Sequence, residues 1–515
     1  MHGVWKMKKI LIAVMVLVMC LQLMGCNSSQ GGEAQDSVMD TATESTPNKQ
    51  ESDPAAKEAV DLIFLHGQDS FDPETDYTRE LIRELLGVNI IPEMGNDDDK
   101  VNLILSSGQE YDMIKLINRN LLVNYIKNDA IYALDEYIDQ YGENLKNAFT
   151  QEEWDMVSYE GKIYGIPETN TTDVEWGFAI REDWLAILGE SMPETPDELY
   201  NVLKRFKEED PGNVGKENVI PLTMEGEISF NGLAQAFGIS EKIDGYIEKD
   251  GKLLPSLEQP GAKELVTYLN KLYKEGLLDA DFPSNKNDGM ISKVAAGIAG
   301  ACKMTPWESA ALKSLRESDS NATLSFLEPL KDADGNQAIV NRSGLKGFLI
   351  VPKSSTKVEE VIKYCNDFLD PANYTTLILG TENETYKMED GKYMPILPGF
   401  DIMNKGRWFY PTNVGEMYTP LFSARAHKED EMGELWDDIN AKAGDNSYEY
   451  ILNYSPTLPE IEELKQKLTE QTKEKIIKMI IDENELKNFD DFVAEWKSKG
   501  GDQLTEAYNE WYTNR

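Results

Sequence analysis

After a polar N-terminal stretch, short apolar runs alternate with amphipathic segments, and this alternation constrains the fold more than any other feature of the sequence. The apolar runs at residues 62–65, 88–91 and 113–117 predict buried strands. Between them, residues 81–86 place their apolar side chains on one helical face, and residues 101–105 predict a second helix. Strand, helix, strand, helix and strand in close succession indicate an α/β layer with a mainly parallel sheet.

The same alternation continues toward the C-terminus. Thr195, Pro196 and Glu198 form a helix start, because Thr can cap the helix, Pro suits the first turn and Glu can close a capping box. Further periodic segments predict helices at residues 262–274 and 358–368 and in the tail from 459 onward, and strands at 295–301 and 347–352. No internal repeat of solenoid type is visible.

The first 25 residues predict a secretory signal peptide. Lys6, Lys8 and Lys9 precede an apolar stretch that is too short to span a bilayer, which requires about 20 residues. The Leu-Met-Gly-Cys motif at residues 23–26 resembles the bacterial lipobox, and this resemblance implies that Cys26 becomes the lipidated first residue of the mature chain. A simple signal peptide with a chance cysteine is the alternative.

Residues 26–57 predict a lipidated, disordered tether. They are rich in Ser, Thr, Gln, Gly, Glu and Asp and contain no aromatic residue, so they cannot bury enough apolar surface to fold. A tether of this kind suits a domain that is anchored to a cell surface.

The charge balance excludes several partners. Lys and Arg number 51 against 92 Asp and Glu, which gives a formal net charge of −41. A chain this acidic is unsuited to nucleic acid and to anionic lipid, and self-repulsion favours a soluble monomer.

The scarcity of histidine and cysteine argues against metal and nucleophile chemistry. With 3 His and no hydrolase, nucleotide or dinucleotide motif, the sequence predicts no enzyme activity, no bound metal and no cofactor. The 4 Cys cannot form a disulfide framework, and we expect Cys302 and Cys365 to be buried thiols.

Several segments past residue 58 resemble, in their order, the family 1 extracellular solute-binding proteins of the maltodextrin-binding type, and especially the long lipoprotein branch of Gram-positive bacteria. They are YDMI at 111–114, GKIYGIP at 161–167, IREDWL at 180–185, PETPDEL at 193–199, EGLLD at 275–279, MTPW at 304–307 and NFDDF at 488–492. Each segment is weak alone, whereas the set is specific.

This resemblance implies an α/β, two-lobe periplasmic-binding-protein-like fold of type II, with mixed sheets flanked by helices and a ligand cleft at the hinge. The analogy places crossings between the lobes near residues 167, 323 and 352. It divides the folded chain into an N-terminal lobe of residues 58–167 plus 324–352 and a C-terminal lobe of residues 168–323 plus 353–515.

The resemblance also implies a function. It indicates a lipoprotein on the extracellular face of the cytoplasmic membrane that captures a sugar or oligosaccharide and delivers this solute to an ABC transporter permease. Two alternatives stay open: a secreted glycoside hydrolase, since the many acidic residues could include a catalytic pair, and a peptide-binding surface lipoprotein with the same fold.

The sequence departs from the family at a loop that resembles a calcium site in many members. Hard cations need closely alternating oxygen ligands, and Val214 and Lys216 interrupt such an alternation within residues 210–218. We therefore expect no calcium at this loop.

A sugar site requires flat apolar faces for ring C–H groups and convergent polar groups for hydroxyls. Trp307 is the leading candidate, because it follows a strand of small residues and the resemblance implies a stacking Trp at this position. Trp176 and Trp408 lie in turn-rich stretches and are further candidate stackers.

Polar candidates come from two sources. The carboxyl ends of predicted strands are followed by Gln68 and Asp69 and by Asn118 and Arg119, at the edge where open α/β sheets bind ligands. The resemblance adds the residues after the first crossing and those of a loosely matching contact loop, namely Glu168, Asn170, Glu225 and Phe230.

Overall fold

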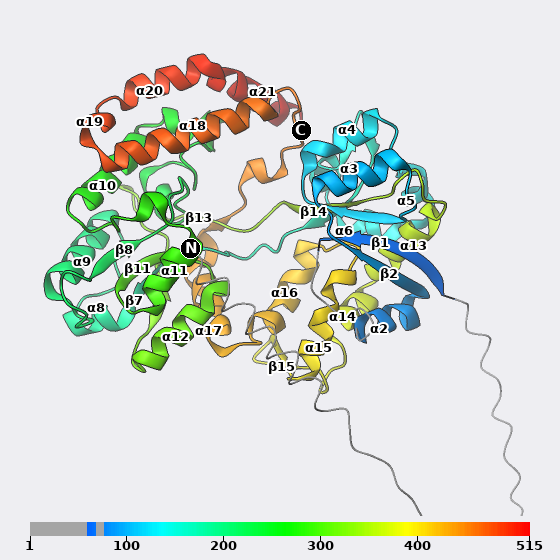
Figure 1. Cartoon of the computed structure of the whole chain (residues 1–515), viewed down its shortest axis with the longest axis horizontal. Helices are drawn as coiled ribbons and strands as arrows, with labels where there is room; N and C mark the ends of the chain where they lie inside the picture. The colour runs from blue at the N-terminus through cyan, green and yellow to red at the C-terminus, as the bar shows by residue number, and fades with distance from the viewer. Residues whose placement is uncertain (1–58, 68–76) are drawn as a thin grey trace, which may run out of the picture. The chain divides into compact units, whose positions relative to one another are not determined.

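The computed structural model describes residues 59–67 and 77–515 (Figure 1). The expected signal peptide, Cys26, the tether, Gln68 and Asp69 lie outside the described residues. Two sheets, each with its own hydrophobic core, organise the described part.

The first sheet has the strand order β2-β1-β3-β14-β6. Its strands are β1 Val60–His66, β2 Val88–Met94, β3 Met113–Leu116, β6 Ile166–Thr169 and β14 Leu345–Ile350. β1 pairs in parallel with β2 and β3, as the apolar runs predict, whereas β14 lies antiparallel between β3 and β6. The sheet is therefore mixed, and a strand from far along the chain, β14, is inserted between β3 and the edge strand β6.

Gly347 allows this insertion. A Cβ atom at this position would lie 2.7 Å from the carbonyl oxygen of Leu116 and 3.3 Å from a carboxylate oxygen of Glu168. The register shifts between Leu345 and Gly347, where the pairing with β6 is irregular. A larger residue at 347 would overlap the backbone of β3 at Leu116.

Helices surround the first sheet, and their buried side chains share its core (Figure 1). They are α2 Tyr77–Leu86, α3 Asp98–Ser107, α4 Leu122–Lys127, α5 Asp135–Tyr141, α6 Glu143–Ala148, α7 Gln151–Asp155, α13 Val358–Phe368, α14 Pro371–Leu379, α15 Gly399–Lys405 and α16 Gly415–Ala426. We call the residues of this core and sheet the first lobe.

The second sheet has the order β12-β7-β11-β8 and is also mixed. Its strands are β7 Gly177–Arg181, β8 Ile220–Thr223, β11 Ala299–Met304 and β12 Leu324–Phe326. β7 is antiparallel to β11 and β12, and β11 is parallel to β8. Because successive side chains of a strand point to opposite faces, Phe178 and Ile180 enter one core and Ala179 enters another.

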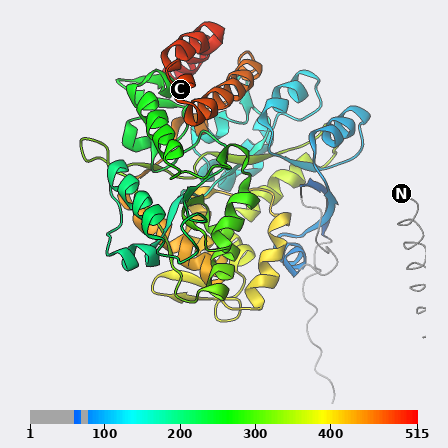
Figure 2. The same ribbon diagram turned by 60° about the vertical axis from the view of Figure 1, so that its left-hand side comes forward.

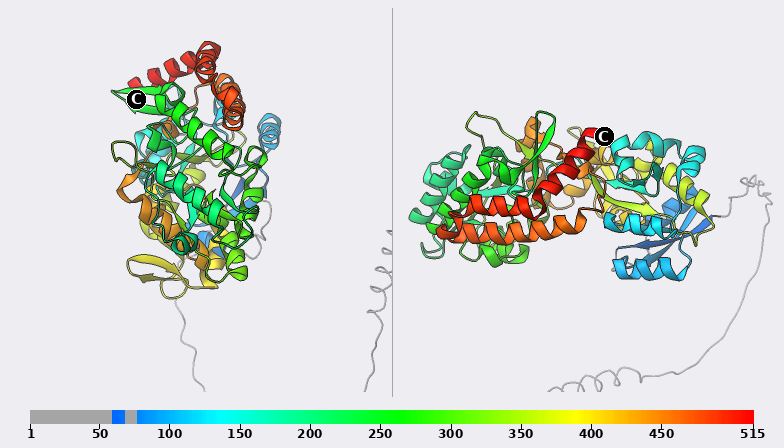
Figure 3. Two further views of the ribbon diagram at one scale, coloured as in Figure 1. Left: turned by 90° about the vertical axis from the view of Figure 1, so that its left-hand side faces the viewer. Right: turned by 90° about the horizontal axis from the view of Figure 1, so that it is seen from above.

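Both faces of the second sheet are covered. One face packs against α8 Glu182–Leu188, α9 Pro196–Glu209, α10 Pro260–Lys274 and the C-terminal helices α18 Glu462–Ile481, α19 Glu483–Leu486, α20 Phe489–Trp496 and α21 Asp502–Asn514. The other packs against α11 Asn287–Ala295, α12 Ser309–Ser318 and α17 Asp430–Ala443. We call these elements the second lobe. α18 lies beside α10, and the chain then returns through α20 and α21 alongside α18 (Figures 2 and 3).

Smaller elements complete the described part. The short strand pairs are β4 Ser158–Tyr159 with β5 Lys162–Ile163, β9 Tyr246–Lys249 with β10 Lys252–Pro255, β13 Ile339–Val340 with β17 Ser447–Tyr448, and β15 Tyr386–Glu389 with β16 Lys392–Pro395.

The helix ends follow the expected chemistry. Gly87 and Gly108 end the first two helices with φ of +66° and +67°, a conformation that glycine adopts without a steric penalty. Thr195 caps α9 by accepting a hydrogen bond from the Glu198 amide. The Glu198 carboxylate accepts from the Glu194 amide at 2.8 Å and not from Thr195, so the box is displaced by one residue.

The chain crosses between the lobes at residues 170–176, 327–344 and 427–429, which join β6 to β7, β12 to β14, and α16 to α17. The expected third crossing near residue 352 does not occur, because residues 358–424 pack their apolar side chains into the core of the first lobe. This packing differs from the expected division, which assigned all of 353–515 to the second lobe. The boundaries of the lobes as folding units stay a prediction.

Cys302 and Cys365 are buried, free thiols, as expected. They lie in different cores. Within the described part of the chain, none of the helices is both long enough and apolar enough to cross a bilayer.

Candidate functional site

Two cavities lie along the crossings between the lobes. The first cavity has a volume of about 410 Å³, and side chains of both lobes line it. Its first-lobe lining includes His66, Lys115 and Trp408, and its second-lobe lining includes Trp307. The volume lies within the range of small-molecule sites, roughly 300–1,000 Å³.

Trp307 is placed by a sharp change of structure at the end of β11. Thr305 and Glu308 form a capping box around the short helix Pro306–Glu308, which turns the indole toward the cavity. The ring is half-buried and packs edge-to-face against Phe422, with 5.4 Å between the centroids. Its Nε1 donates a hydrogen bond of 2.8 Å to Glu175. Trp307 is therefore both a lining residue and part of a small aromatic cluster with Phe422 and Trp436.

Glu175 connects two of the crossings. It lies on the first crossing, and its Oε1 also contacts the Arg342 guanidinium on the second crossing at 2.7 Å. One carboxylate thus fixes the indole of Trp307 and joins the segments at which the lobes meet.

Trp408 lines the cavity from the first lobe, on the short helix Gly406–Phe409. His66 contacts it edge-to-face with 5.4 Å between centroids, and the guanidinium of Arg407 lies 4.2 Å from its ring centroid. Burial and the neighbouring charge of Arg425 lower the pKa of Arg407.

Glu168 is the most buried acid of the first cavity. Its carboxylate contacts Lys115 and Lys346, each at 2.9 Å. Burial opposes ionisation, yet the two lysines lower the pKa of Glu168 to about 2. Glu168 therefore stays ionised and serves as the counterion of two lysines.

His66 is buried at the carboxyl end of β1. Burial and the positive charge of Lys115 lower its pKa to about 3, so the imidazole is neutral at physiological pH. His66 therefore gives the first cavity an uncharged ring with a polar nitrogen, packed against Trp408.

The second cavity is larger, about 630 Å³, and shares Asn170, Glu175 and Arg342 with the first. Its lining includes Arg119, whose Nη1 donates to the Ser455 carbonyl oxygen at 2.8 Å, and Trp176. The two cavities therefore adjoin at the three shared residues, and we call the pair of adjoining cavities the groove.

The structure brings six of the predicted site residues to this groove and a seventh to a neighbouring side pocket. Trp307, Trp408 and Glu168 line the first cavity, Arg119 and Trp176 line the second, and Asn170 lines both. These residues come from segments that are distant in the sequence. Gly67, at the start of the loop after β1, also lines the first cavity.

The seventh, Glu225, lines a side pocket of about 300 Å³ that shares Trp176 and Lys242 with the second cavity, and it contacts Lys303 at 3.5 Å. The two remaining described candidates lie elsewhere. Asn118 caps a short helix and donates to Asp98 at 2.8 Å, outside the lining of the groove. Phe230 is 1 % exposed within the core of the second lobe, because its aromatic ring fills space between packed helices.

Sequence reasoning missed most of the charged lining. Arg342, Lys346 and Arg425 lie in segments without a motif, and Glu175 directly precedes the candidate Trp176 without a motif of its own. Arg407 alone could have been found from the sequence as a charged lining residue, because it directly precedes the candidate Trp408.

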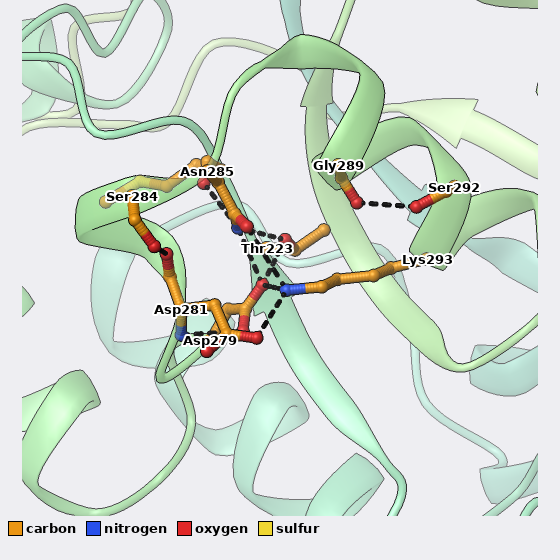
Figure 4. A network of polar contacts seen from close by, with 9 residues as sticks. Thr223, Asp279, Asp281, Ser284, Asn285, Gly289, Ser292 and Lys293 are labelled. Carbon is orange, nitrogen blue, oxygen red and sulfur yellow. Dashed lines mark hydrogen bonds and ion pairs between the residues drawn. The ribbon is translucent and has the colours of Figure 1, made fainter. Parts of the chain in front are cut away.

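A group of acidic and amide side chains in the second lobe surrounds Lys293 (Figure 4). Asp279 accepts hydrogen bonds from Thr223 at 2.7 Å, Asn285 at 2.8 Å and Lys293 at 2.6 Å. The lysine ammonium thus occupies the position at which a metal would be coordinated, so these residues form a structural network. The described residues contain no group of three or more His, Cys, Asp or Glu arranged to hold a metal ion.

The loop at residues 210–218 is closed by its own hydrogen bonds. Asp210 accepts from the amides of Val214 at 3.0 Å and Gly215 at 2.9 Å. These bonds use both oxygens of the carboxylate that would have to begin a calcium site.

The two carboxylates that line the first cavity are both held by cations. A glycosidase needs a carboxylic acid that stays protonated near neutral pH, beside an ionised partner. The pKa of Glu168 is lowered, and Glu175 is held by Arg342 and Trp307. Burial raises the pKa of Asp173 to about 7, but Asp173 does not belong to the lining of either cavity.

The chain matches a family model and is similar to several bacterial proteins. Residues 85–401 match a family model described as bacterial extracellular solute-binding protein. Lipoprotein LipO of Bacillus subtilis (strain 168) is 26% identical over 435 residues, covering 81% of this chain and 84% of LipO. The polygalacturonan/rhamnogalacturonan-binding protein YtcQ of the same organism is 23% identical over 515 residues, covering 98% of both chains.

A solved structure shares the fold. The substrate-binding protein FusA of Streptococcus pneumoniae, in complex with kestose, superposes with a TM-score of 0.67 and 19% sequence identity. The match covers 88% of this chain and 99% of that structure. This likeness confirms the expected two-lobe α/β fold.

Proposed function

Because this chain belongs to the bacterial extracellular solute-binding proteins, we propose that it captures an oligosaccharide in the groove between its lobes and delivers this ligand to the permease of an ABC importer. The function is reversible binding without a covalent step. Closure of the lobes on the ligand is the conformational change that the permease recognises, since a ligand shifts the equilibrium toward the state that it binds better.

The observation that carries this proposal is the joined groove itself. Trp307 and Trp408 enter the first cavity from different lobes, and Trp176 lies in the second cavity. Aromatic faces at successive positions suit the apolar faces of sugar rings, and the neighbouring amides, carboxylates and guanidinium groups suit the hydroxyls. A groove of two cavities favours an oligomer over a single sugar.

The names of the relatives support a carbohydrate. YtcQ is named for polygalacturonan and rhamnogalacturonan, and FusA was solved with kestose. The similarity to a lipoprotein also supports anchoring through Cys26 on the extracellular face of the membrane, with residues 26–57 as the tether. We propose that the protein acts as a monomer and has no enzyme activity.

The test is a titration of the purified protein with a panel of oligosaccharides, by isothermal calorimetry, with chromatography of each mixture afterwards. We expect at least one oligosaccharide to bind and to be recovered intact. Shortened products would identify a hydrolase. Binding of peptides, with no saccharide bound, would identify a peptide-binding lipoprotein.

A further inference from the structure

The first cavity carries a charge opposite to that of the chain. Among the described residues, its lining has more cations than carboxylates, although the whole chain has a formal net charge of −41. The cations are Lys115, Arg342, Lys346, Arg407 and Arg425, and the carboxylates are Glu168 and Glu175.

The two carboxylates are already engaged. Glu168 neutralises part of the charge of Lys115 and Lys346, and Glu175 binds Arg342. Arg407 and Arg425 have no carboxylate within 4.0 Å among the residues that the structure describes. Two positive charges therefore face the cavity without a counterion from the described chain.

Several other arginines of the described chain do contact a carboxylate. Arg83, Arg205 and Arg316 contact carboxylates at 2.6 Å, 2.7 Å and 2.7 Å respectively. A chain rich in Asp and Glu readily supplies partners, so two neighbouring arginines without one require another explanation. Placing like charges side by side costs free energy unless an anion joins them.

Both guanidinium groups lie next to an indole of the groove. Arg407 lies 4.2 Å from the ring centroid of Trp408, and Arg425 lies 5.4 Å from that of Trp307. Among the described residues, the Arg407 guanidinium donates one hydrogen bond, to the Asn404 carbonyl oxygen, so most of its donors stay available. Each aromatic face is thus paired with a planar cation.

We propose that the natural ligand is an oligosaccharide of uronic acids, whose ring carboxylates bind Arg407 and Arg425 while the C–H faces of the same rings pack against the adjacent indoles. This inference rests on the proposed function and specifies its substrate class. A guanidinium binds a carboxylate through two parallel hydrogen bonds, and such charge-assisted bonds are stronger than bonds to neutral hydroxyls. Lys115 and Lys346 already hold one carboxylate, that of Glu168, in the same cavity.

The second cavity lacks this excess of positive charge. Its lining holds the cations Arg119, Lys242, Arg342 and Lys465 and the carboxylates Glu175, Glu227, Glu241, Asp244 and Glu462. Selection for the charged groups of the ligand is therefore expected in the first cavity, whereas the second accommodates further sugar residues.

The test compares ligands that differ only in charge. The purified protein is titrated with oligogalacturonate and oligomannuronate trimers, with their methyl esters, with neutral galactose and mannose trimers, and with a sulfated galactose trimer, at low and at high salt. We expect at least one uronate trimer to bind roughly tenfold or more tightly than its ester. We also expect salt to weaken binding of the acid more than binding of the ester.

Substitutions locate the effect. Arg425→Gln and Arg407→Gln should each weaken uronate binding about tenfold and change the affinity for the ester less than about threefold. Arg83→Gln removes the same charge from the exposed surface of α2 and should leave both affinities unchanged. Thermal unfolding of each variant verifies that it is folded.

The possible results separate this inference from the proposed function. Equal affinity for acid and ester, or binding of neutral trimers alone, would overturn carboxylate recognition and leave oligosaccharide capture standing. A sulfated trimer that binds when the uronates do not would likewise overturn it. If no saccharide binds, both the inference and the proposed function are wrong.

Discussion

Trp307 illustrates how one side chain can serve packing and binding together. Its ring edge contacts Phe422, its Nε1 is held by Glu175, and it lines the first cavity. A ring fixed on two sides loses little conformational entropy when a ligand packs against it, which favours affinity.

Replacing this indole should separate its two contributions. We expect Trp307→Ala to weaken oligosaccharide binding by about 2 kcal/mol, or roughly 30-fold, since a buried aromatic contact of this kind dominates small interfaces. Trp307→Phe keeps a flat face and loses the hydrogen bond to Glu175, so it should retain most of the affinity. Calorimetric titration measures both variants. Equal losses for Ala and Phe would show that the hydrogen bond, and not the ring face, matters.

Glu168 sets a pH dependence of stability. Its pKa is lowered to about 2 in the folded chain, below its usual value of about 4.3 in an unfolded chain. A lowered pKa means that the ionised group stabilises the fold. This contribution is complete above about pH 5 and is lost as the pH falls toward 2.

Glu168→Gln should therefore destabilise the protein most at neutral pH, by on the order of 3 kcal/mol, because it leaves the buried Lys115 without a counterion. The difference in the free energy of unfolding between this variant and the natural chain should shrink as the pH falls below about 4. Urea unfolding at a series of pH values measures it. Glu359→Gln is the control, since solvent screens the exposed pair that Glu359 forms with Lys363 and this pair should contribute little to stability at any pH. A difference for Glu168→Gln that does not change with pH would contradict this account.

At the scale of elements, α10 depends on a close approach to its neighbour. Gly261 lies in its first turn, and a Cβ atom there would fall 1.6 Å from the carbonyl oxygen of Phe237. The helix can pack at this distance only because glycine has no side chain. In α11, by contrast, a Cβ atom at Gly289 would meet nothing nearer than 3.7 Å.

The same substitution should therefore have opposite effects in the two helices. Gly289→Ala is expected to stabilise the protein by about 0.5–1 kcal/mol, through the higher helix propensity of alanine. Gly261→Ala is expected to destabilise it by about 2 kcal/mol or more, because the backbone must shift to relieve the overlap. Thermal unfolding of both variants measures whether each substitution stabilises or destabilises the protein. Stabilisation by both would show that α10 can move away without cost.

At the scale of the whole molecule, the described chain has two principal cores connected by the crossings at residues 170–176, 327–344 and 427–429. The first core surrounds β1 and β14, and the second lies against β7 and β11. Few covalent connections join the two, so their cooperativity depends on contacts across the groove.

Ligand should increase this cooperativity. Without ligand, we expect scanning calorimetry to give an unfolding enthalpy larger than its van't Hoff value, the mark of more than one cooperative unit. A ligand at about 100 times its Kd should add about 2.7 kcal/mol to the free energy of unfolding. Because it contacts both lobes, it should also bring the calorimetric enthalpy closer to the van't Hoff value. Equal enthalpies without ligand would show that the lobes already unfold as one.

The sequence alone determined the local elements. Apolar periodicity located β1, β2, β3, α2 and α3, because side-chain period is a property of neighbouring residues. Gly87 and Gly108 are local features too, because glycine adopts the positive φ at which these helices end without a steric penalty. The sequence also located Trp307, Trp408 and Trp176, whose surroundings of turns and small residues are local signals.

Only the tertiary structure decided which charges meet. Lys115 and Glu168 lie on strands on opposite sides of β14, and Lys346 comes from β14 itself. Their convergence depends on the insertion of a strand from late in the chain between β3 and β6, and nothing in the sequence near Lys115 specifies that neighbour. The packing of residues 358–424 into the first core and the burial of Phe230 are likewise non-local. Periodicity specifies which side of an element is apolar, whereas the partner of that side depends on the packing of the complete chain.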